Sequence, residues 1–127
     1  MARRVSHKVK LYTVLGDYVA IEVEAGTSIE LLRKIQKVLN KGGEDVEDSI
    51  RMIQHFDVFY SLMCRKFKDF LTPKKNISEL LRGNVLVDKI KLAKRDDEKV
   101  VVIVFDKSLN KDLIEKALTE LGYEVIL

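Results

Sequence analysis

The sequence predicts one domain of the α+β (or α/β) class over residues 1–127, with a mixed sheet of about five strands packed by one long helix and two to three shorter helices. Residues 18–25 alternate apolar and polar side chains, which is the period of a strand with one buried face. Residues 45–71 contain neither Gly nor Pro and carry apolar side chains at steps of three or four, which is the period of a helix. A chain of 127 residues can also bury one core without disulfides.

The first part of the chain predicts a β-hairpin followed by a helix. Residues 8–14 are rich in strand-forming side chains, and Gly16 in the connection to the next strand can take the positive φ that a hairpin turn needs. Thr27, with Glu30 three residues later, forms a capping-box pattern that places a helix start here. The buried side of this helix should carry Ile29, Leu32, Ile35, Val38 and Leu39.

Residues 45–71 predict the longest helix, which at the usual rise per residue would be about 40 Å long and would organise the rest of the domain. Thr72 and Pro73 end it. The single cysteine, Cys64, lies in this helix and is expected to pack inertly. The apolar stripe of the helix comprises Val46, Ile50, Ile53, Phe56, Tyr60, Met63, Phe67 and Phe70.

The next segment predicts a short helical turn and a second hairpin. Asn76 and Glu79 form another capping-box pattern, and the turn that they open carries Ile77, Leu80 and Leu81. Residues 85–93 fit either a strand or a helix. Their β-branched content and the short polar link after them favour a strand paired with residues 100–105.

The end of the chain predicts a strand, a helix and a strand. Residues 100–105 are an unbroken apolar run, which indicates a strand buried on both faces. If strands 100–105 and 123–127 lie side by side, they are parallel and joined by a right-handed crossover. The helix between them, over residues 110–121, should turn Leu113, Ala117, Leu118 and Leu121 inward.

No arrangement of catalytic residues, metal ligands or cofactor-binding motifs is recognisable, so we expect a protein that is not an enzyme and has no metal or cofactor. His55 and Asp57 are two apart on a helix and would point in different directions. Gly42 and Gly43 precede a helix start, where an anion could bind, but the acids that follow would repel it.

The composition indicates a cytoplasmic protein without a membrane partner. One cysteine excludes a disulfide within the chain, and no apolar run reaches the length of a membrane-spanning helix. The charged fraction of 34%, rich in Lys and Glu, also suits a thermophile.

Positive charge is concentrated in the middle of the chain, where residues 65–95 carry ten basic and three acidic side chains. Such a surplus predicts an anionic partner, and RNA is the partner we favour. Few aromatic residues accompany it, so we expect contact with the nucleic-acid backbone rather than base stacking. Arg3, Arg4 and Lys8 could join the patch. The candidate nucleic-acid-binding residues are Arg65, Lys66, Lys68, Lys74, Lys75, Arg82, Lys89, Lys91, Lys94 and Arg95.

A second interpretation is a protein-interaction or homo-oligomeric domain whose lysines only keep it in solution. The apolar face of the predicted long helix is wider than one sheet would cover, which leaves room for a partner or a second subunit. A third interpretation is an enzyme whose site is assembled across a dimer. The candidate protein-interface residues are Met52, Phe59, Leu62 and Met63.

Three stretches resemble one family, the small accessory subunit of the KEOPS tRNA-modification complex, which is related to the human PRPK-binding protein. They are residues 17–35, residues 52–57 and residues 75–78, and together they cover about a third of the chain. Residues 83–99 depart from the family, because they lack its helix with a Ser-Gly-x-Arg-Gln type motif. The resemblance implies a non-catalytic subunit that docks on an atypical kinase and helps to hold tRNA, with roles for Lys74, Lys75, Lys94 and Arg95.

Overall fold

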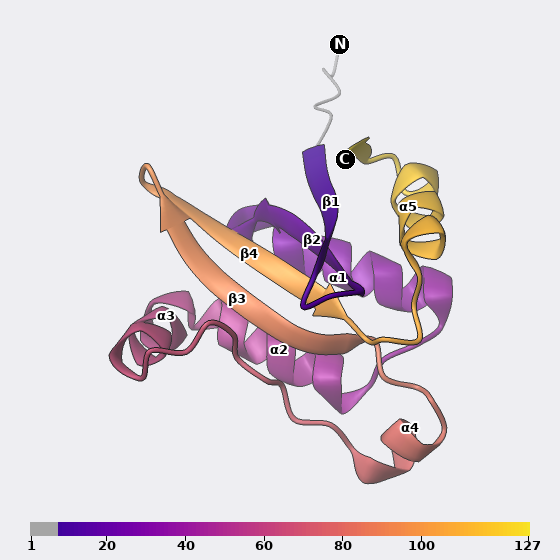
Figure 1. The fold of residues 1–127 in the computed structure, drawn as a ribbon, viewed down its shortest axis with the longest axis horizontal. Helices are drawn as coiled ribbons and strands as arrows, with labels where there is room; N and C mark the ends of the chain where they lie inside the picture. The colour runs from indigo at the N-terminus through magenta and orange to yellow at the C-terminus, as the bar shows by residue number, and fades with distance from the viewer. Residues whose placement is uncertain (1–7) are drawn as a thin grey trace.

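The computed structural model describes residues 8–127 and confirms an α+β fold with a five-stranded mixed sheet (Figure 1). Arg3 and Arg4, which could join the basic patch, lie outside the described residues. None of the helices in the described part is both long and apolar enough to cross a membrane. In chain order the elements are β1 (Lys8–Val14), β2 (Tyr18–Glu24), α1 (Ala25–Leu39), α2 (Glu44–Gln54), α3 (Phe56–Arg65), α4 (Ile77–Leu81), β3 (Val87–Arg95), β4 (Glu98–Phe105), α5 (Lys111–Glu120) and β5 (Glu124–Ile126).

The strands lie in the order β3-β4-β2-β1-β5, and in this described part of the chain only the β1–β5 pair is parallel. Both predicted hairpins are confirmed: β1 pairs with β2 around Gly16, whose φ is 93°, and β3 pairs with β4. The strand predicted over residues 85–93 is therefore confirmed as a strand, with its bounds at Val87–Arg95. Strands β4 and β5 are not neighbours, because β2 and β1 lie between them.

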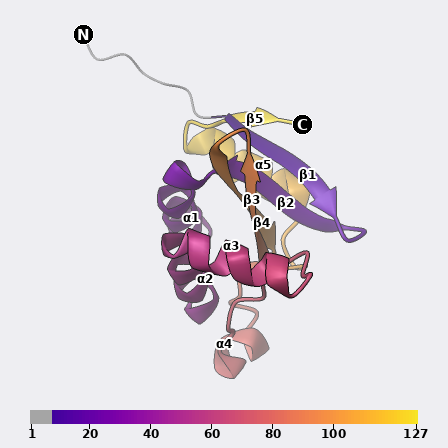
Figure 2. The same cartoon turned by 90° about the vertical axis from the view of Figure 1, so that its left-hand side faces the viewer.

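The two faces of the sheet are covered differently. One face packs against α1, α2, α3 and α5 and forms the main core, and Figure 2 shows α1, α2 and α3 together on one side of the strands. The other face carries a small cluster of Ala20, Val102 and Val104, and the apolar side chains that pack on it within residues 8–127 come from β1, β2 and Phe70, not from a helix. Residues 100–105 are buried throughout, as the apolar run predicted, because β4 contributes to both clusters.

The single helix predicted over residues 45–71 is wrong. It is divided at His55, whose φ of −107° and ψ of 46° are not helical, and α3 ends at Arg65. Phe67 has a positive φ of 52° and is 93% exposed, so it does not belong to the core stripe. The apolar period continues across the break because both helices bury their stripes against the same sheet face.

Smaller corrections concern the other helix boundaries and faces. Helix α1 begins at Ala25, and the hydroxyl of Thr27 donates to the carbonyl of Glu24 instead of capping the helix. In α1, Val38 is exposed. In α5, Ala117 and Leu118 are buried and Leu121 packs against the core, as predicted, but Leu113 is exposed and Ile114 is buried in its place.

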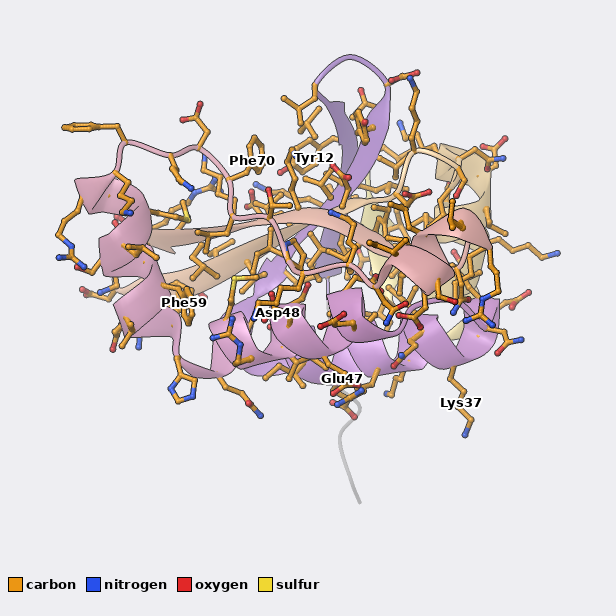
Figure 3. The ribbon with its side chains drawn as sticks, turned by 90° about the horizontal axis from the view of Figure 1, so that it is seen from below. Tyr12, Lys37, Glu47, Asp48, Phe59 and Phe70 are labelled. Atoms are coloured by element: carbon orange, nitrogen blue, oxygen red, sulfur yellow. The ribbon has the colours of Figure 1, made fainter. Side chains whose placement is uncertain are left out.

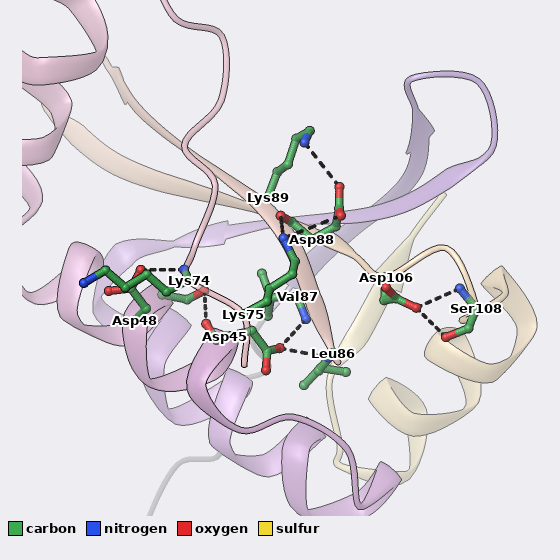
Figure 4. A network of polar contacts seen from close by, with 11 residues as sticks. Asp45, Asp48, Lys74, Lys75, Leu86, Val87, Asp88, Lys89, Asp106 and Ser108 are labelled. Carbon is green, nitrogen blue, oxygen red and sulfur yellow. Dashed lines mark hydrogen bonds and ion pairs between the residues drawn. The ribbon is translucent and has the colours of Figure 1, made fainter. Parts of the chain in front are cut away.

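A buried carboxylate joins α2 to the start of β3 (Figure 4). The Asp45 side chain is 1% exposed and accepts three backbone hydrogen bonds, one from Gly43 at 2.9 Å and one each from Leu86 and Val87 at 2.8 Å. Asn76 caps α4 as predicted, but Glu79 reaches another element and accepts from the backbone N–H of Glu44 at 3.1 Å. These bonds fix where β3 enters the sheet and therefore where its basic side chains lie.

Candidate functional site

The sheet face without helices, here called the open face, presents two rows of side chains that cross four strands. One row runs from Tyr12 through Ala20 and Val104 to Lys89, as the strand registers define. At the usual spacing between strands, its ends are about 14 Å apart. The neighbouring row runs through Lys10, Glu22, Val102 and Lys91.

Aromatic side chains gather on the open face. Tyr12 and Tyr18 come from the first hairpin, and Phe70 comes from the segment after α3; all three are half-buried against Ala20, Val102 and Val104. Figure 3 shows Tyr12 and Phe70 on the side of the sheet away from α1 and α2. The ammonium group of Lys91 lies 6.0 Å from the centre of the Phe70 ring. A base could stack on such rings, which the sequence analysis did not anticipate.

A cluster of charged side chains lies beside Tyr12. The Glu22 carboxylate accepts from Arg95 at 2.5 Å and lies 3.7 Å from the ammonium of Lys10. Burial raises the pKa of the Tyr12 hydroxyl above the usual value of 10.0, Glu22 adds to the rise and Arg95 opposes it. Tyr12 therefore stays protonated at neutral pH and can donate a hydrogen bond. Arg95 and Lys10 are partly neutralised, which leaves Lys91 as the freer cation of this row.

A hollow of about 700 Å³ lies at the β3–β4 turn end of the open face. Its rim mixes Lys8, Lys10 and Arg95 with several carboxylates, so it does not favour an anion. Positive charge in excess of acids is found instead toward Lys89 and Lys91. The acidic residues of the hollow are Glu22, Glu24, Asp96 and Glu98.

The ten predicted basic residues do not form one patch. Lys89, Lys91 and Arg95 face the open side of β3. Lys68, Lys74 and Lys75 lie on the segment that runs beside the β3 edge, where Leu71 pairs with Ile90. Arg65 and Lys66 are at the end of α3, just before Lys68. Arg82 is at the end of α4, and Lys94 lies on the helix-covered side of the sheet.

Several of these cations have partners inside the protein. The Lys75 ammonium donates to the Asp88 carbonyl at 3.0 Å, and Lys89 lies 3.5 Å from the Asp88 carboxylate. Lys94 lies 3.5 Å from Asp57 and over the Tyr60 ring at 4.9 Å, so it fastens β3 to α3. Lys75 and Lys94 therefore have a structural role.

The predicted protein-interface residues are mostly internal. Met52 and Met63 are 3% and 4% exposed and belong to the main core, so neither can contact a partner directly. Phe59 is half-buried and contacts the Arg51 guanidinium, and Leu62 is half-buried on α3. Exposed apolar side chains are found at other positions, among them Ile77, Leu80 and Leu81 of α4 and also Val58 and Phe67.

The features considered for catalysis remain separate. His55 is exposed at the break between α2 and α3. Cys64 is exposed, contrary to the expected inert packing, and its interaction with Tyr60 raises the pKa of the tyrosine hydroxyl. Within residues 8–127, no three His, Cys, Asp or Glu side chains are grouped as a metal site would require. At Gly43, the space considered for an anion holds the Glu79 carboxylate of this chain.

The fold and this face define an α+β domain with an uncovered aromatic and basic sheet surface. Comparison with known proteins found no matching family model, no matching curated protein and no matching solved structure.

Proposed function

We propose that this protein is a non-catalytic binding module that holds single-stranded RNA across the open face, as an accessory subunit of a larger complex. The observation that carries the proposal is the row from Tyr12 to Lys89, which places an aromatic ring and a cation on one uncovered sheet surface. Sheets with exposed aromatic rings are a recurrent way to bind single strands, since every base can stack on a ring.

The positions of the side chains indicate which of them would contact bases and which would contact phosphates. Tyr12, Tyr18 and Phe70 offer rings for bases, whereas Lys91, together with Lys89, which also pairs with Asp88, offers ammonium groups for phosphates. The ring contribution depends little on salt, but each phosphate contact releases counterions and makes binding salt-dependent. The two contributions can therefore be measured separately.

A labelled oligouridylate, titrated by fluorescence anisotropy over a series of salt concentrations, tests the proposal. Replacing Lys89 and Lys91 by Ser should lower the slope of log affinity against log salt by about 1.4. Tyr12→Ser should weaken binding by about tenfold or more, because one base loses its stacking partner, and should leave the slope unchanged.

The matched control replaces Lys107 and Lys116 by Ser. These lysines are exposed, and the substitution changes the net charge by the same amount away from the open face. The control should bind like the unmodified protein. Equal weakening by both double variants, or no binding at low salt, would contradict the proposal.

A protein-interaction domain is the second candidate, and α4 favours it. Ile77 and Leu81 are 74% and 82% exposed, and α4 is held by polar contacts such as that of Glu79 with Glu44. A helix that turns its apolar side chains to solvent offers them to another protein or a second copy. Light scattering after size exclusion distinguishes these: a dimer that Leu81→Ser dissociates supports self-association, and a strict monomer excludes it.

A further inference from the structure

The β3 strand is an edge of the sheet that is only partly paired. Leu71 and Ile90 exchange two backbone hydrogen bonds, 2.8 Å and 2.9 Å long. Continuing this antiparallel pairing would bring Asp69 opposite Leu92. Instead, among the described residues no backbone hydrogen bond joins residues 67–69 to this edge, and both segments line a groove. The edge beyond Ile90 is thus left without a neighbouring strand among the described residues.

The unpaired backbone groups are those of Leu92 and Lys94. Outward and inward pairing alternate along an antiparallel strand, and Ile90 pairs outward. Leu92 and Lys94, which follow Ile90 by two and four residues, therefore also direct their N–H and C=O groups outward. Within residues 8–127, neither is hydrogen-bonded to any backbone on that side. Such alternating donors and acceptors are matched by an extended peptide, which carries both in the same spacing.

A groove follows this stretch of edge. It has a volume of about 390 Å³ and lies between the end of α3 with residues 67–69 on one side and residues 91–94 on the other. Its floor includes Met63 and Leu92 of the main core. An added strand would thus find backbone partners along one wall and an apolar floor for one of its side chains.

The charges of the groove select the occupant. Lys68, Lys91 and Lys94 line it, against one acid, Asp69. Lys94 is shared with Asp57, but neither Lys68 nor Lys91 has an ion-pair partner among the described residues. Pairing two copies of this edge would bring the basic side chains Lys91, Lys94 and Arg95 of one copy close to those of the other, and such like charges across strands are unfavourable. An acidic partner avoids this repulsion.

We propose that the β3 edge binds an extended acidic segment of a partner protein, which adds to the sheet as a further strand at Leu92 and Lys94. This site differs from the RNA surface, because it uses outward backbone groups and not the open face. The two sites are adjacent through Lys91, so a bound acidic strand would weaken RNA binding by occupying that cation.

A labelled peptide of alternating Glu and Val, titrated into the full chain, tests the proposal. We expect a dissociation constant below about 1 mM. Lys94→Pro removes an outward N–H while Pro is tolerated on an edge strand, and it should weaken binding by about tenfold. The matched control Lys94→Ser also loses the ammonium group but keeps the N–H, and it should bind more tightly than Lys94→Pro.

Amide hydrogen exchange by NMR gives a readout that does not depend on a variant that folds. In the free protein the Ile90 amide should be protected and that of Lys94 should exchange quickly; the peptide should slow exchange at Leu92 and Lys94. The proposal is overturned if the peptide does not bind, if Lys94→Pro and Lys94→Ser bind equally, or if oligouridylate and not the peptide protects these two amides.

Discussion

The two faces of one sheet show how the same strands serve stability and exposure. On the helix-covered face, residues such as Ile21 and Ile103 are 0% exposed beneath four helices. On the open face, Val102 and Val104 are also buried, but the apolar side chains packed over them are the partly buried Tyr12, Val14, Tyr18 and Phe70. The first face is sealed by whole secondary-structure elements and the second by single side chains, which can move aside for a ligand.

The largest expected effect is on the helix-covered side, at Asp45. Asp45→Ala leaves two buried backbone N–H groups and one partly buried N–H group without their acceptor and should lower the free energy of unfolding by about 3 kcal/mol or more. Urea unfolding measures this. Asp106→Ala is the control, since this carboxylate caps an exposed turn at Ser108, and it should cost about 1 kcal/mol. Equal losses would mean that burial does not distinguish the two carboxylates.

A matched pair of substitutions compares the faces directly. Val101→Thr places a hydroxyl in the main core and should cost about 1–3 kcal/mol. Val102→Thr places the same hydroxyl under the thin layer of the open face, where water reaches it more easily, and should cost less. Thermal unfolding of both variants tests the comparison, and it fails if Val102→Thr is the more destabilising.

Phe67→Ser should change the free energy of unfolding by no more than about 0.5 kcal/mol, because the ring is 93% exposed. Met63→Ser is the contrasting variant and should be clearly destabilising, since Met63 is 4% exposed in the core. A large loss of stability on Phe67→Ser would instead support the continuous helix over residues 45–71 that the sequence predicted.

The smallest expected effect concerns pH. Lys99, with Lys94 second, lowers the pKa of Asp57 below its usual 3.8. A carboxylate with a lowered pKa in the folded state contributes stability above its unfolded pKa and loses it as pH falls. Asp57→Asn should therefore remove a small part of the acid destabilisation below about pH 4. Urea unfolding at neutral and acidic pH measures how much stability each protein loses on acidification. An equal loss in Asp57→Asn and in the unmodified protein would exclude this role.

The sequence predicted the strands well because their periodicity is local. The alternation in β2 and the apolar run in β4 follow from which faces of the strand are buried, and this pattern is visible within each strand's own sequence. It could not predict the break at His55, since no Gly or Pro marks it and the apolar stripe continues beyond it. Phe67 and Phe70 were consequently assigned to a helix that had already ended.

The candidate site was only partly predictable. The alternation of Lys89 and Lys91 implied a shared face, but only the sheet order brings Tyr12 into line with Lys89. The signal for Tyr12 and Tyr18 was present, because both alternate with core residues of the first hairpin. The sequence did not show that helices leave this face of the sheet uncovered, because that depends on the tertiary packing of the domain.

The central claim is that RNA binds the open face. The most direct measurement is the map of NMR amide shift changes when oligouridylate is added to the full chain at low salt. We expect the largest changes at Tyr12, Lys91 and Val102, with α1 and α2 unaffected. Changes confined to the helices, or none at saturating oligouridylate, would contradict the account.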